Sequence, residues 1–158
     1  MTQEEKERRI ATARENFRKG YGCCQAVALT YADVLQMSEA DIAKVAAGFG
    51  GGFARMREVC GCVSGMTMVA GAISPSINPG VQPERKANYA LVQELAAAYK
   101  AINGSIICRE ILTGAGCAPT PCDGPEPSLR TPEFYKKRPC EELCGIAAGL
   151  LADRIENN

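Results

Sequence analysis

Residues 48–71 read GFGGGFARMREVCGCVSGMTMVAG, a glycine-rich loop that leads into a predicted helix. Cys60 lies where this helix is expected to begin. Its sulfur would therefore meet the unpaired N–H groups and the partial positive charge of a helix N-terminus, which stabilise a thiolate. Gly61 and Gly65 are four residues apart and would let another helix or a cofactor approach closely. Cys60 is accordingly the first candidate for chemistry.

Other cysteines occupy similar positions, each after a glycine, serine or proline and before a helical pattern. They are Cys24, Cys108 and Cys140. For any one cysteine the alternative is a small, buried and inert side chain. If the helix starts converge on one point, their positive ends would compensate the negative charge that four thiolates around iron produce.

The hydrophobic pattern predicts an all-α fold, a compact bundle of about six to seven helices with a glycine-rich loop and a proline-rich loop. No segment shows a convincing period-two alternation, and we expect a single domain over residues 1–158. Thr2 and Glu5 form a capping box at the first helix, and Pro119–Pro139 should be irregular with one helical turn after Thr131. The residues expected to face inward include Cys24, Val27, Tyr31, Val34, Ile42, Val45, Ala46, Phe49, Ala87, Leu91, Leu95, Ala98, Ile102, Leu143, Ala147 and Leu150.

Composition excludes several classes of protein. Lys and Arg total 18, as do Asp and Glu, and the basic residues are scattered, so nucleic-acid binding is not expected. No apolar run approaches the length of a membrane span and the N-terminus shows no export signal, which predicts a soluble, cytoplasmic protein. The 9 cysteines and the absence of histidine favour metal binding or redox work through thiolates, and exclude Cys–His pairs and c-type haem attachment.

The spacing of the cysteines matches none of the common short motifs. Cys60 and Cys62 form Cys-x-Cys, Cys23 and Cys24 are adjacent, Cys140 and Cys144 are one helical turn apart, and Cys117 and Cys122 lie in the proline-rich loop. No Cys-x-x-Cys is present, so a thioredoxin-type site is not indicated. The glycine run lacks the Lys-Ser/Thr of a phosphate-binding loop and reads as a connection, although glycines also let backbone N–H groups approach sulfurs.

Several segments together resemble a family of redox-active proteins named for a cysteine, a Cys-Gly-Ala-x-x-Gly motif and two further cysteines. The matching segments are residues 24–27, 48–52, 58–65, 108–110 and Cys140 with Ala147 and Ala148. The resemblance spans Cys24 to Ile155. One departure is Cys62, which stands where the family has alanine. Cys23, Cys117, Cys122 and Cys144 are further additions, which could serve a second site or an extra redox step.

The resemblance implies a helical, redox-active domain, often encoded beside oxidoreductases or transporters. A similar domain in split-Soret cytochrome c carries an iron–sulfur centre beside its haems. Since this chain has no histidine, only the iron–sulfur part can carry over. By position, the resemblance makes Cys24, Cys60, Cys108 and Cys140 the ligands of an iron–sulfur cluster.

Three hypotheses follow. The first is a small electron-transfer protein, rather than an enzyme with its own substrate, that passes electrons between its iron–sulfur cluster and an oxidoreductase partner protein. The second is cluster-free thiol–disulfide exchange, with Cys60 as the attacking thiol and Cys62, Cys24 or Cys144 as the resolving thiol. The third is a structural zinc module. The small-residue helix faces and the related cytochrome domain also suggest a homodimer.

Overall fold

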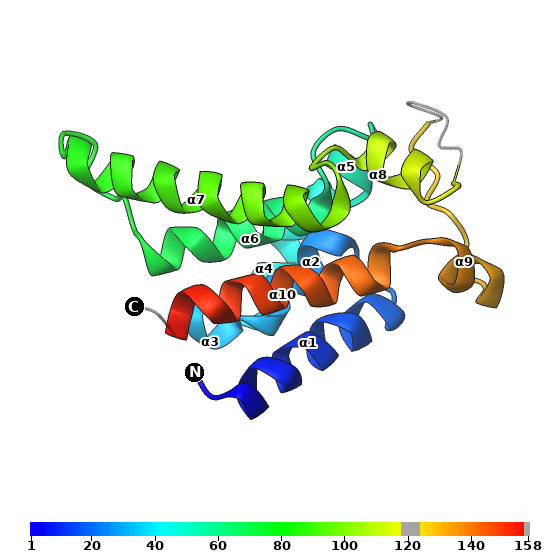
Figure 1. The fold of residues 1–158 in the computed structure, drawn as a ribbon, viewed down its shortest axis with the longest axis horizontal. Helices are drawn as coiled ribbons and strands as arrows, with labels where there is room; N and C mark the ends of the chain where they lie inside the picture. The colour runs from blue at the N-terminus through cyan, green and yellow to red at the C-terminus, as the bar shows by residue number, and fades with distance from the viewer. Residues whose placement is uncertain (118–123, 157–158) are drawn as a thin grey trace.

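The computed structural model describes residues 1–117 and 124–156, and within them the chain is mostly helical (Figure 1). The elements are α1 (Gln3–Arg18), α2 (Cys23–Thr30), α3 (Ala32–Leu35), α4 (Glu39–Ala46), the 3₁₀ turn η1 (Ala47–Phe49), α5 (Gly50–Phe53), α6 (Gly61–Ile73), α7 (Gln82–Asn103), α8 (Cys108–Gly114), α9 (Pro132–Lys137) and α10 (Cys140–Glu156). In these residues the only β-pairing is an isolated antiparallel bridge between Val59 and Ile107. The all-α prediction is confirmed.

The described residues contain about nine regular helices, so the predicted number of six to seven was too low. Tyr31 accounts for part of the difference, because its backbone (φ −117°, ψ 30°) leaves the helical region and separates α2 from α3. The segment named α5 is not counted as regular, because Gly51 and Gly52 have φ of +67° and +70°. The glycine-rich stretch is therefore a tight left-handed loop, a conformation that glycine adopts without steric cost.

The helix ends follow the sequence signals. The Thr2 hydroxyl caps α1 by accepting the Glu5 N–H at 3.1 Å, which confirms the Thr2 half of the predicted capping box, while the Glu5 carboxylate pairs with Arg9. The single helical turn predicted after Thr131 is α9, capped by the Thr131 hydroxyl. Gly104 ends α7 with a left-handed φ of +85°, which an L-residue with a side chain rarely adopts.

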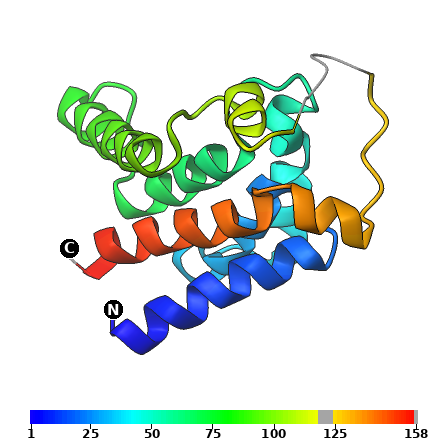
Figure 2. The same cartoon turned by 45° about the vertical axis from the view of Figure 1, so that its right-hand side comes forward.

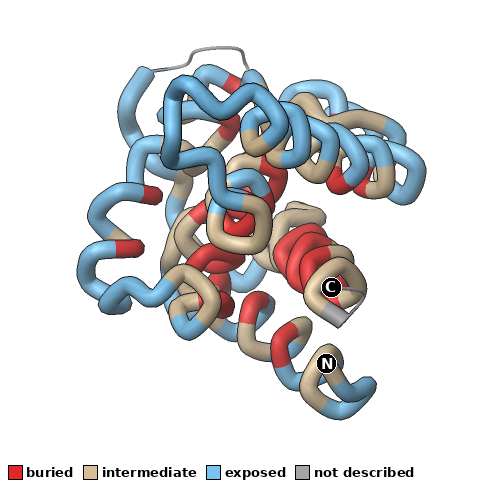
Figure 3. The backbone as a smooth tube through the Cα atoms, turned by 90° about the vertical axis from the view of Figure 1, so that its left-hand side faces the viewer, coloured by how far each residue is buried: buried red, intermediate tan, exposed pale blue. Residues whose placement is uncertain are grey.

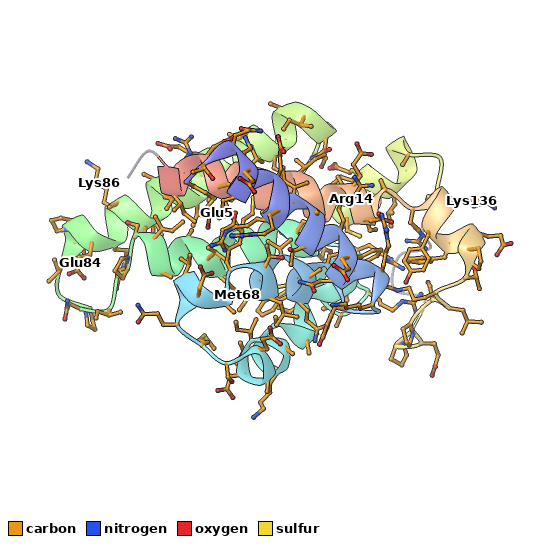
Figure 4. All side chains as sticks on the ribbon, turned by 90° about the horizontal axis from the view of Figure 1, so that it is seen from below. Glu5, Arg14, Met68, Glu84, Lys86 and Lys136 are labelled. Atoms are coloured by element: carbon orange, nitrogen blue, oxygen red, sulfur yellow. The ribbon has the colours of Figure 1, made fainter. Side chains whose placement is uncertain are left out.

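The helices pack around one core, and the faces that they turn toward it are buried (Figure 3). α1 lies along α10, and α6 lies between α2 and α7 (Figures 1 and 2). The two termini meet at one end, where the Lys6 ammonium pairs with the Asp153 carboxylate at 2.5 Å. At the other end lie α5, α8 and α9; Figure 4 labels Lys136 of α9 there, opposite Glu84 and Lys86 of α7.

Three predicted core positions are wrong, and one of them is Ala87 near the start of α7, which is exposed. Ile102 is 58% exposed, and Tyr99 on the same helix is fully buried in its place, because α7 presents only the stripe through Leu95 and Tyr99 to the core. Val45 is 50% exposed, since α4 buries only Ile42 and Ala46. In the described part of the chain, no helix combines the length and apolar character needed to cross a membrane.

Candidate metal centre

The predicted cysteines do lie at the beginnings of helices. Cys60 is the N-cap of α6, Cys108 is the first residue of α8, and Cys140 is the first residue of α10. The helix containing Cys24 begins one residue earlier, at Cys23. Four separate segments therefore present sulfur at the positive end of a helix.

Backbone contacts bring these helix starts together at the end of the molecule that carries α5 and α8. The Cys60 N–H donates to the Ile106 carbonyl at 2.8 Å, and the Cys108 N–H donates to the Glu58 carbonyl at 2.6 Å. These two bonds join the residues before α6 to those before α8. On the other side of α6, a Cβ added to Gly61 would lie 2.9 Å from Cys23 Cβ, closer than real Cβ atoms approach. Only glycine lets α2 begin against α6 at this distance.

The result is a group of sulfurs that we call the thiol cluster, made of Cys23, Cys60, Cys62, Cys140 and Cys144. At its centre the Sγ atoms of Cys23, Cys62 and Cys144 all lie within 4.8 Å of one another, and those of Cys62 and Cys144 are 3.7 Å apart. Cys60 joins the group through Cys62, and Cys140 joins it through Cys23. All eight cysteines in the described residues are free thiols.

The electrostatics of the thiol cluster favour a shared negative charge. The pKa of Cys23 is well below its ordinary value, because the thiols of Cys140, Cys144 and Cys62 hydrogen-bond to it and Arg130 adds positive charge, against the effect of burial. The pKa of Cys60 is lowered by the Cys62 thiol and, further, by the hydroxyl of Tyr99, whose oxygen lies 3.2 Å from the sulfur.

The thiols that donate in this network have raised pKa values. For Cys62, Cys140 and Cys144 the first cause is the hydrogen bond to a neighbouring cysteine, and burial adds to it. One thiolate is thus stabilised by neighbours that stay protonated. Such a group releases its remaining protons when a cation replaces them, which is how thiols become metal ligands.

The four ligands predicted from the sequence are not all in one contact group. Cys60 and Cys140 belong to the thiol cluster. The Cys24 sulfur instead contacts Met68 Sδ at 3.6 Å, and burial raises its pKa to about 12. The Cys108 sulfur lies 4.0 Å from Arg57 Nη1, and burial raises its pKa as well.

Of the two cysteines in the proline-rich loop, only Cys117 lies in the described residues, and its contact is with α9. Cys117 donates to the Lys137 carbonyl at 3.2 Å, and Cys122 lies outside the described residues. The sequence analysis treated Cys23, Cys62 and Cys144 as additions to the four-cysteine pattern of the family. Two features of the sequence nevertheless connect Cys144 and Cys62 to the predicted ligands. Cys144 is one helical turn from Cys140 and so shares its face, and Cys62 is two residues from Cys60.

A model of the family described as "Putative redox-active protein (C_GCAxxG_C_C)" matches residues 21–154. That range contains every member of the thiol cluster. No curated protein and no solved structure matches the chain.

Proposed function

Because the chain belongs to this family of redox-active proteins, we propose that its thiol cluster holds an iron–sulfur cluster and that the protein passes electrons to an oxidoreductase partner. The observation that carries the proposal is the convergence of sulfurs from three helices, α2, α6 and α10, on one buried point. Iron–sulfur clusters are held by cysteine thiolates and supply one-electron transfer.

The residues present fit such a group. Cys62 and Cys144 are fully buried and Cys60 is 5% exposed, so that bulk water would be excluded from the centre. Buried anions need compensation, which the amino ends of α2, α6 and α10 supply together with the nearby Arg130. Tyr99 and the backbone at Cys62 donate toward the Cys60 sulfur, and hydrogen bonds to sulfur tune reduction potentials.

The surface near the cluster is formed by Cys23 and Cys140, the two members that are only partly buried. Electrons would pass between the centre and a partner protein across this edge. A partner that docks over α9 and the loop of Gly50 and Gly51 would come within reach of both sulfurs, because these segments line the same cavity as Cys23 and Cys140.

Elemental analysis of protein purified without oxygen tests the proposal. We expect a brown protein that contains iron and acid-labile sulfide, with charge-transfer absorption that bleaches on reduction. A colourless protein that contains neither iron nor sulfide would overturn the proposal.

Single cysteine variants decide which sulfurs are the ligands. If the thiol cluster binds the metal, Cys62→Ala and Cys144→Ala should each remove most of the iron, and Cys24→Ala and Cys108→Ala should retain it. The reverse pattern would support the ligand set predicted from the sequence, Cys24 and Cys108 with Cys60 and Cys140. Circular dichroism of each variant shows whether the helices remain folded, since all four positions are buried.

Zinc is a second candidate, favoured by one distance. Two thiolates bound to one tetrahedral ion at ~2.3 Å are about 3.8 Å apart, and the Sγ atoms of Cys62 and Cys144 are 3.7 Å apart. A structural zinc site would contain stoichiometric zinc, no sulfide and no colour. The same elemental analysis therefore distinguishes a redox centre from a structural one.

Cluster-free thiol–disulfide exchange is a third candidate, supported by the lowered pKa of Cys60 and the contact between Cys60 and Cys62. Exchange requires that a second thiol or disulfide reach the attacking sulfur, whereas Cys60 is 5% exposed and Cys62 and Cys144 are fully buried. Trapped-thiol mass spectrometry across a range of redox buffers should find one interconverting pair if exchange is the function. Light scattering of the same protein tests the expected homodimer, which would have twice the mass of the chain.

A further inference from the structure

A cavity of about 530 Å³ opens beside the thiol cluster. Cys23 and Cys140 form part of its wall, so that a molecule inside it would touch the cluster from the solvent side. The opposite walls come from the glycine loop and from the segment around α9. Ligand cavities in proteins usually measure 300–1,000 Å³, so this one is large enough for a small organic molecule.

The cavity is strongly basic. Its lining includes the side chains of Arg55, Arg57, Arg130 and Arg138, and no Asp or Glu among the described residues. Within the part of the chain that the structure describes, no carboxylate pairs with Arg57, Arg130 or Arg138. Arg130 instead donates to the carbonyls of Phe17 and Tyr21.

Arg57 is the most informative of these residues, because it is 5% exposed. Among the described residues its Nε atom has no hydrogen-bond partner, and its Nη1 atom hydrogen-bonds to the weak acceptor Cys108 Sγ at 4.0 Å. A buried guanidinium normally has an anionic partner and satisfied N–H groups, because an unpaired buried charge is costly. The chain places this charge at a cavity wall and leaves room in front of it.

We propose that this cavity binds a small organic anion, whose negative group pairs with Arg57 and Arg138 directly beside the thiol cluster. Two helix starts strengthen the attraction, since the first residues of α2 and α10 also line the cavity and helix N-termini favour anions. Arg138 is placed to contribute because its guanidinium lies 5.4 Å from the ring of Phe134, which is part of the wall.

The rest of the ligand should be apolar. The remaining walls include Phe134, Pro125 and Pro127, which offer apolar surface to a ring or an aliphatic chain. A bare inorganic ion would leave these walls in contact with water and would gain less. The site therefore suits a carboxylate or phosphate carried on a small hydrophobic body.

Calorimetric titration of the as-purified protein tests the proposal with three probes: phenyl phosphate, inorganic phosphate and the uncharged benzyl alcohol. We expect phenyl phosphate to bind one per chain and at least tenfold more tightly than either of the others. Because charged hydrogen bonds are lost, Arg138→Gln and Arg57→Gln should each weaken its binding about tenfold or more. Arg85→Gln, which changes an exposed arginine of α7 outside the cavity, is the matched control and should have no effect.

The outcomes are distinct. Equal binding of phenyl phosphate and benzyl alcohol, or equal binding by wild type and Arg138→Gln, would overturn the proposal. If Arg57→Gln fails to fold, Arg138→Gln still decides, because its side chain is only partly buried. Loss of metal in Arg57→Gln with unchanged phenyl phosphate binding would show that Arg57 compensates the thiolates instead. The titration does not depend on iron, so its failure would leave the proposed metal centre standing.

Discussion

Cys23 and Cys24 are neighbours in the sequence, yet their sulfurs lie in different environments. As the first two residues of α2, they point in directions about 100° apart. Cys23 therefore meets Cys62 and Cys144, and Cys24 enters the core beside Met68. A rotation of α2 by one residue would turn Cys24 toward Cys62 and Cys144 and would carry Cys23 away from them. The chemistry of the site thus depends on the rotational setting of one short helix.

Arg9 holds another short helix, α3, in place through a single side chain. Its guanidinium is largely buried and donates to the Asp33 carboxylate at 2.7 Å and 3.0 Å, which joins α1 to α3. The pKa of Asp33 is below its ordinary value of 3.8, first because of this hydrogen bond. The pair therefore contributes stability above the pKa of the unfolded chain and loses it as the pH falls through the folded-state pKa.

We predict that Asp33→Asn lowers the free energy of unfolding by about 1 kcal/mol at pH 7, a value reduced for the exposure of Asp33. The difference from wild type should shrink as the pH falls below the ordinary Asp value. Urea unfolding at pH 7 and at a pH below the ordinary Asp value measures this difference in the free energy of unfolding. Glu94→Gln, which removes an exposed ion pair with Arg154, should change little at either pH. A deficit in Asp33→Asn that persists in acid would contradict this account.

At the scale of elements, the contact between α2 and α6 depends on glycine. A Cβ at Gly61 would lie 2.9 Å from Cys23 Cβ and 3.1 Å from the Cys24 nitrogen, which is backbone and cannot move alone. We predict that Gly61→Ala destabilises the protein by about 1–3 kcal/mol, because the two helices must move apart. Denaturant unfolding measures the change.

Gly71, on the same helix, provides the control. A Cβ there would meet nothing within 4 Å, so Gly71→Ala should stabilise α6 by up to about 1 kcal/mol through helix propensity. Equal effects of the two substitutions would mean that the helix spacing is not limited at Gly61.

The sequence was sufficient to predict which segments are helical and where several of them begin. Caps such as Thr2 and Thr131 and the stop at Gly104 are local signals, and local chemistry decides them. The errors lie in features that tertiary contacts decide. Tyr31 breaks a helix that its sequence would continue, and α7 turns the stripe through Leu95 and Tyr99, rather than Ile102, toward the core.

The candidate site was predictable only in part, for the same reason. Glycine, proline and the hydrophobic pattern predict that helices begin at cysteines. Which of these helix starts lie close together is decided by the packing of the helices, which the local sequence does not show. The hydrophobic stripe turns Cys24 inward, as the structure confirms, but it does not show which of Cys23 and Cys24 meets Cys62 and Cys144. The pairing of Val59 with Ile107 likewise joins segments far apart in sequence. Arginine is usually an exposed residue type. Arg57 is buried because the glycine loop folds over it, with Gly52 held against its backbone.

At the scale of the whole molecule, Arg130 holds the segment that precedes α10 against the end of α1. This side chain donates to the carbonyls of Phe17 and Tyr21 at 3.0 Å and 3.1 Å, and its guanidinium lies 4.0 Å from the ring of Phe17. The contact closes one side of the cavity beside the thiol cluster. Helix α9 has no fully buried residue of its own, so contacts such as those of Arg130 hold it against α1.

We predict that Arg130→Ala accelerates tryptic cleavage after Lys136 and Lys137 about tenfold, which corresponds to ~1.4 kcal/mol of lost local stability. Leu129→Ala, at an 81% exposed neighbour, should leave the rate unchanged. Peptide mass mapping of timed digests measures both. Unchanged cleavage in Arg130→Ala would mean that other contacts hold the segment.

The sulfurs that meet at one point come from residues far apart in the sequence, as far apart as Cys23 and Cys144. During synthesis the early thiols therefore leave the ribosome well before Cys144 exists. Until Cys144 has been added, Cys23 and Cys62 are open to oxidation or to capture of the wrong ion. The complete set of sulfurs forms only when α10 packs against α2 and α6, so that assembly of the site is a late step in the folding of this chain.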